Sequence, residues 1–151
     1  MMVGASRAHG LIVSNMVVAL HSRLDPARWQ VISEFGLDAG PDTLRYPDIV
    51  VDHTGGGAKD RTAAPVLLAE VLSPSTAETD FGDKTAEYLR IPSLLAYIIL
   101  SQDEPKAWVW IRAGTEFTPG PAVLGDPAAI MQIPALRLEL PLAELYAGIH
   151  P

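Results

Sequence analysis

Cysteine is absent from the 151-residue chain. The protein therefore has no disulfide, no thiolate nucleophile and no zinc site built on thiolates. The absence also fits a reducing compartment, and we expect a cytoplasmic protein.

Basic residues are scarce as well. The chain has 11 Lys and Arg against 18 Asp and Glu, a net charge of −7. Broad, non-specific binding to nucleic acid depends on Lys and Arg that neutralise phosphates, so this balance argues against it. A nuclease is not excluded, because an acidic site for a divalent cation adds negative charge of its own.

Long apolar runs are missing too. The run from Leu11 to Leu20 contains Ser14 and Asn15 and is about half as long as a membrane span requires. No basic region, apolar segment and cleavage site follow one another as in a signal peptide. We therefore expect a soluble protein with no membrane contact. Apolar residues still make up 48% of the chain, enough for one packed domain over residues 1–151.

The pattern of apolar residues predicts alternating helices and strands. Helices are expected at 5–24, from a cap at Ser75 or Thr76 to Leu89 or Arg90, and from Pro141 onward. Strands are expected at 29–35, 46–52, 66–72, 94–100, 107–111 and 130–133. Residues 36–41 are predicted to form a turn, and 116–126 an irregular segment. This order indicates an α+β (mixed α/β) fold.

Two of the predicted strands carry an acid where apolar residues dominate. Asp48 lies in one of them, and Glu70 interrupts 66–72, which is apolar on both faces and therefore central. A buried strand has little reason to carry an acid unless something pairs with it. The connection 53–61 resembles a hairpin loop, so the strands can be neighbours with both carboxylates facing one pocket.

Such a pair of carboxylates suits a divalent cation. Two acids aimed at one point repel each other unless a cation or a proton lies between them. Mg²⁺ prefers oxygen ligands, polarises phosphoryl oxygens and lowers the pKa of bound water. The helix that follows carries Asp80, Lys84 and Tyr88 on one stripe, and its lysine can stabilise developing charge.

Each of these residues has a structural alternative. Asp48 can cap a turn or pair with Arg45. Glu70 and Lys84 can form a buried pair without a catalytic role, and Lys84 can equally belong to an exposed helix pair with Asp80.

Several aromatic and loop residues are open to two interpretations as well. Tyr88 can be a core residue. Trp108 and Trp110, which alternate along one strand, suit a core or an interface as well as base stacking. His53 can ligate a metal or simply be a solvated loop residue. The triple glycine after it lacks the spacing of a phosphate-binding loop, so we interpret this segment as a plain connection.

Four segments together resemble a known family. They are Tyr46-Pro47-Asp48-Ile-Val-Val, Ala69-Glu70-Val-Leu-Ser-Pro-Ser-Thr76, Asp80-x3-Lys84-x3-Tyr88 and Ile91-Pro92-x4-Tyr97. Over roughly residues 8–147 the chain resembles the Uma2 family (DUF820), which is grouped with the PD-(D/E)XK restriction-endonuclease-like nucleases. The resemblance implies a central mixed β-sheet flanked by helices.

The resemblance also implies an activity and a site. The expected protein is a Mg²⁺-dependent (or Mn²⁺-dependent) endonuclease that hydrolyses phosphodiester bonds in DNA, with a homodimer as one arrangement. Asp48 and Glu70 are the implied metal ligands and catalytic acids. Lys84 is the implied catalytic lysine, with Asp80 and Tyr88 in support.

The chain departs from the family pattern at three positions. Leu72 stands where the lysine of the "XK" half-motif is expected, so Lys84 is its substitute from the helix. Ala8 and Ala96 stand where acids are common. The alternative is therefore a catalytically degenerate nuclease fold used for binding or assembly, and a hydrolase of small phosphoesters is a weaker third hypothesis.

Overall fold

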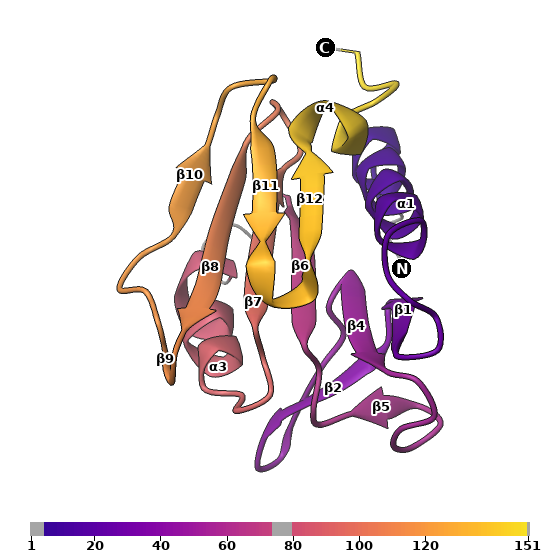
Figure 1. Cartoon of the computed structure of the whole chain (residues 1–151), viewed down its shortest axis with the longest axis vertical. Helices are drawn as coiled ribbons and strands as arrows, with labels where there is room; N and C mark the ends of the chain where they lie inside the picture. The colour runs from indigo at the N-terminus through magenta and orange to yellow at the C-terminus, as the bar shows by residue number, and fades with distance from the viewer. Residues whose placement is uncertain (1–4, 74–79, 151) are drawn as a thin grey trace.

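The centre of the fold is a mixed sheet in the order β1-β4-β6-β7-β8-β10 (Figure 1). The computed structural model describes residues 5–73 and 80–150. The strands are β1 (Trp29–Ser33), β4 (Ile49–His53), β6 (Leu67–Leu72), β7 (Ala96–Ser101), β8 (Ala107–Ala113) and β10 (Ala122–Leu124), with β9 (Glu116–Phe117) paired to β8. Only β6 and β7 pair in parallel among these described strands.

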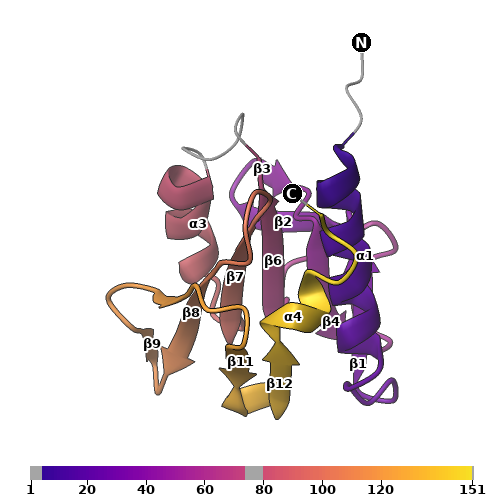
Figure 2. The ribbon, with the colours of Figure 1, turned by 90° about the horizontal axis from the view of Figure 1, so that it is seen from above.

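One face of the sheet is covered by two helices and a hairpin. These are α1 (Arg7–His21), α4 (Leu142–Leu145) and the hairpin of β11 (Ile130–Ile133) and β12 (Leu138–Pro141), joined by the short helix η2 (Pro134–Leu136). Figure 2 shows this layer opposite α3. It encloses the larger apolar cluster, to which Ile49 and Val51 of β4 belong.

The opposite face is covered by a second, smaller layer. Its members are η1 (Asp80–Lys84), α3 (Thr85–Leu89) and a small sheet of β3 (Thr43–Arg45), β2 (Gly36–Gly40) and β5 (Arg61–Thr62). Val50, Tyr88 and Tyr97 belong to the apolar cluster on this side. The alternation of Ile49, Val50 and Val51 between the two clusters confirms that the central strands are covered on both faces.

Helix α1 is fixed at both ends by polar contacts. The Ser6 hydroxyl accepts a hydrogen bond from the backbone N–H of His9 at 3.1 Å, which satisfies one of the first N–H groups of the helix. Beyond its other end, Arg23 donates to both carboxylate oxygens of Glu144 at 2.7 and 2.8 Å. None of the helices in the described part of the chain has the length and apolar content to span a bilayer.

The expected mixed α/β fold is confirmed, with corrections in its short strands. Residues 36–41, predicted as a turn, contain β2, which pairs antiparallel with β3 and parallel with β5. The irregular segment 116–126 contains β9 and β10, and the partner strand β12 was not predicted. Pro141 ends β12 and caps α4 instead of opening it. These strands are short, so their pairing partners, more than their own sequence, determine them.

The second predicted helix also differs from expectation. The described part begins with a π-helical turn, η1, and continues as α3 to Leu89. Its predicted cap at Ser75 or Thr76 lies outside the described residues. A π turn changes the spacing of side chains and occurs frequently at functional sites.

Candidate active site

Asp48 and Glu70 meet at one end of the sheet. Strands β4 and β6 are antiparallel neighbours, and Ile49 is paired with Ala69. One further step in this register places Asp48, which precedes β4, opposite Glu70. The Asp48 Oδ2 atom accepts a hydrogen bond from the Val71 backbone N–H at 2.7 Å, so its carboxylate is held against the Glu70 strand. The expected neighbourhood of the two strands is confirmed.

His9 at the start of α1 completes the surroundings of Asp48. Its Nε2 atom lies 3.2 Å from Asp48 Oδ2, and both side chains are 18% exposed. The hydrogen bond to Asp48 is the main cause that raises the pKa of His9, and the charges of Asp48, Glu70 and Glu34 act in the same direction against burial. His9 is therefore favoured as a cationic donor to the carboxylate.

Sequence reasoning assigned no role to His9. The available signal was its place in α1, where it lies on the same side of the helix as the buried residues Ile12, Met16 and Leu20. A polar residue that continues a buried stripe at the end of a helix needs a partner. Here the partner is Asp48.

Glu70 is buried and receives contacts from the helical layer. The residue is 5% exposed. Its Oε1 atom accepts a hydrogen bond from the Tyr88 hydroxyl at 3.2 Å and lies 3.8 Å from Lys84 Nζ. Burial, followed by the charge of Glu70, raises the pKa of Tyr88, so its hydroxyl stays protonated as a donor.

The helical layer brings two of its three predicted site residues to Glu70. Lys84 ends the π turn, and Tyr88 follows one turn later in α3. The side chain of Asp80 lies outside the described part of the structure, so its predicted supporting role stays a prediction. Arg45 does not pair with Asp48, because it donates to both carboxylate oxygens of Glu87 at 3.0 and 2.8 Å.

The donor set fits a hard divalent cation. In the described residues no group of three or more His, Cys, Asp or Glu side chains gathers around one point. Mg²⁺ keeps several waters and requires only one or two carboxylates, which Asp48 and Glu70 supply. Both contacts of Asp48 within the described chain fall on Oδ2, which leaves Oδ1 for a cation.

The two tryptophans of β8 differ in their surroundings. Trp110 is 6% exposed and stacks on Tyr97 with ring centroids 5.4 Å apart, so it is a core residue. Trp108 is only partly buried and contacts Phe81 edge-on at 4.9 Å. The expectation of a core role is met by Trp110.

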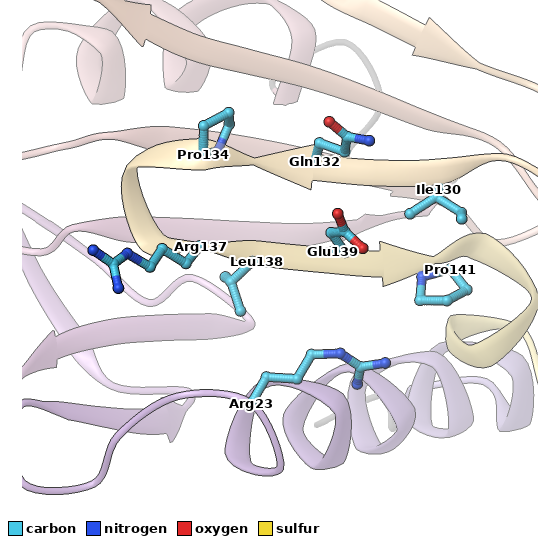
Figure 3. A pocket seen from close by; sticks show the side chains of 8 residues that line it. All are labelled: Arg23, Ile130, Gln132, Pro134, Arg137, Leu138, Glu139 and Pro141. Carbon is cyan, nitrogen blue, oxygen red and sulfur yellow. The ribbon is translucent and has the colours of Figure 1, made fainter.

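A hollow of about 650 Å³ lies on the outer face of the β11–β12 hairpin (Figure 3). Arg23, which lines it, follows the C-terminal end of α1, whereas His9 lies in the first turn of that helix. None of the candidate site residues lines this hollow. It is therefore separate from the candidate active site.

Comparisons with known proteins agree with this architecture. The family Uma2, described as "Putative restriction endonuclease", matches residues 1–143. A crystal structure from Anabaena variabilis, titled as a putative nuclease belonging to DUF820, superposes with a TM-score of 0.78 and 21% sequence identity, over 95% of this chain and 82% of that one. A search of curated proteins finds no match. At this identity the superposition shows a shared fold, while the match over nearly the whole sequence shows that the chain belongs to the Uma2 family.

Proposed function

We propose that the protein is a Mg²⁺- or Mn²⁺-dependent endonuclease that hydrolyses phosphodiester bonds in DNA. The observation that carries this proposal is the placement of Asp48 opposite Glu70, with Lys84 Nζ 3.8 Å from the Glu70 carboxylate. The nuclease-like family and fold support the same activity.

Each residue of the candidate site has a distinct task in this proposal. Asp48 and Glu70 would hold the cation, which when bound supplies charge neutralisation at the phosphoryl oxygens and acidifies water. The Val71 N–H orients Asp48, and the Tyr88 hydroxyl orients Glu70. Lys84 places a positive charge where negative charge develops on the phosphate during attack.

The lysine of the proposal reaches the site from the helix. Leu72 occupies the position two residues after Glu70, where the strand would otherwise supply a lysine. Lys84 comes from η1, which covers the same side of the sheet. A lysine can act from either the strand or the helix, because its ammonium group is carried on a flexible side chain. What matters is the distance from this group to the phosphate, and not which element carries the residue.

The test is nicking of supercoiled plasmid in Mg²⁺ or Mn²⁺. The wild-type protein should convert the plasmid to open circles, and Glu70→Ala should not. Asp48→Asn should lose activity as well. Asp52→Asn is its matched control. Asp52 is a buried acid of β4, 7% exposed, four residues after Asp48 and not opposite Glu70. Equal nicking by wild type and Glu70→Ala, or none by either on DNA, would contradict the proposal.

A second candidate function follows from the same contacts. A degenerate nuclease fold used for binding or assembly would also retain the Glu70–Lys84 pair as a structural contact. Leucine in place of lysine at position 72 is consistent with such a fold. In that case neither carboxylate would bind a cation. A protein that forms a homodimer, measured by light scattering, yet neither binds Mn²⁺ nor nicks DNA would favour this alternative.

A further inference from the structure

An exposed aromatic patch lies beside the candidate active site. Phe81 is 40% exposed, and its ring contacts Trp108 edge-on with centroids 4.9 Å apart. Val123 of β10 is 54% exposed and is paired with Trp108. Lys106 Nζ lies 5.1 Å from the Trp108 ring, and 4.0 Å from the exposed Glu104 carboxylate. We call Phe81, Trp108 and Val123 the aromatic patch.

The register of the sheet connects this patch to the carboxylates. Glu70 is paired with Ile99, Ile99 with Trp108, and Trp108 with Val123. Laterally paired residues point to the same face of a sheet. Trp108 therefore lies on the same face as Glu70, two strands away, which is about 10 Å at the usual strand spacing.

The helical layer connects the patch to the candidate lysine. Phe81 belongs to the π turn η1, three residues before Lys84. The same turn therefore places a charge at Glu70 and an exposed ring on Trp108. Through Trp108, the ring therefore lies about two strand spacings from Glu70, on the same face of the sheet.

We propose that Phe81 and Trp108 form a stacking subsite for an unpaired nucleobase of a single-stranded nucleic acid, next to the phosphate that a cation at Asp48 and Glu70 would bind. This inference rests on the proposed nuclease function and names the form of its substrate. Aromatic rings bind bases of any sequence by stacking, and cations beside them contact the backbone. Lys106 supplies such a cation at the rim of the patch.

Stacking is the contribution to nucleic-acid binding that the net charge of the protein weakens least. With 11 basic and 18 acidic residues, phosphate neutralisation is a weak source of affinity. Stacking does not depend on net charge. Bases within a duplex are covered by their neighbours, so only a single strand or a splayed nucleotide offers a free face. A second copy of this chain could also cover Val123 on the edge strand β10, and the test separates that outcome.

The experiment measures binding of a fluorescently labelled single-stranded oligonucleotide in EDTA. Without a metal the readout depends neither on cleavage nor on the phosphate at the carboxylates, so it reports on the aromatic patch itself. Phe81→Ala should weaken binding about 5- to 150-fold, the range that corresponds to loss of one stacked base. Phe81→Tyr should restore it, and a duplex of the same sequence should bind more weakly than the single strand. Val18→Ala is the control, since Val18 is 66% exposed on α1.

A second pair of variants tests the tryptophan. Trp108→Leu should weaken binding and reduce the quenching of tryptophan fluorescence by the oligonucleotide. Trp29→Leu is its matched control, because Trp29 also lies beside a cation, with Arg28 5.3 Å from its ring. Thermal unfolding of both variants separates lost binding from lost folding.

The outcomes distinguish this inference from the proposed function. If Phe81→Ala and Trp108→Leu bind the single strand as wild type does, or if wild type binds no oligonucleotide, the stacking subsite is refuted. Nicking by the wild type would then still support the nuclease. If Phe81→Ala changes only the oligomeric state, the patch is an interface between copies and the inference fails. Binding that depends on Phe81 in a protein that never cleaves would support the subsite and refute the nuclease.

Discussion

Replacement of Lys84 by methionine should destabilise the protein through Glu70. The Lys84 Nζ and Glu70 Oε1 atoms are 3.8 Å apart, and the side chains are 17% and 6% exposed. At this separation two unit charges attract by about 4 kcal/mol for an effective dielectric constant near 20. Tyr88 continues to donate to Glu70 and offsets part of the loss. We therefore expect a decrease of about 2–3 kcal/mol in the free energy of unfolding.

Urea denaturation measures this decrease, and the chain offers a matched control. Lys106 forms a similar pair with Glu104 at 4.0 Å, but these side chains are 35% and 64% exposed. Lys106→Met should therefore change stability by less than about 1 kcal/mol. The double variant Lys84→Met/Glu70→Gln should recover much of the loss, because the glutamine at this buried position carries no charge.

The same variants report on the proposed cation. Added Mg²⁺ should stabilise Lys84→Met more than the double variant, because a cation replaces the lost positive charge only where Glu70 is ionised. Two results would refute this reasoning. One is a Lys84→Met loss as small as that of Lys106→Met. The other is a double variant no more stable than Lys84→Met alone.

Two further predictions concern structural contacts. Arg45 lowers the pKa of Glu87, chiefly through their hydrogen bonds, so the pair stabilises the fold above the unfolded pKa of glutamate and is lost as pH falls through the folded pKa. Glu87→Gln should therefore be less stable than wild type by urea titration at pH 7, and the difference should shrink as pH falls below the unfolded pKa of glutamate, about 4.3. Tyr146 donates to the carbonyls of Ser101 and Lys106 at 2.6 and 3.0 Å, and burial raises its pKa to about 12. Tyr146→Phe should lose about 1–2 kcal/mol of stability and leave plasmid nicking unchanged.

The central strands and their acids could be predicted from sequence because their signals are local. Alternating or continuous apolar residues mark β4 and β6, with Asp48 directly before β4 and Glu70 within β6. A loop of suitable length then predicts that the strands are neighbours, as the pairing of Ile49 with Ala69 confirms.

The remaining features depend on contacts between distant parts of the chain. Gly36–Gly40 is a strand because β3 and β5 supply its hydrogen bonds, which no local pattern reveals. Ala122–Leu124 is a strand because β8 has an open edge. His9 reaches Asp48 only because α1 packs across the sheet, so its role follows from tertiary packing.

The most direct test of the proposed site is calorimetric titration of Mn²⁺ into the wild-type protein, Asp48→Asn and Asp52→Asn. Asp48 directly precedes β4 and Asp52 lies within it, but only Asp48 is opposite Glu70. We predict one binding event for the wild type, its loss in Asp48→Asn and its retention in Asp52→Asn. Equal binding by wild type and Asp48→Asn, or no binding by the wild type, would contradict a cation site between Asp48 and Glu70.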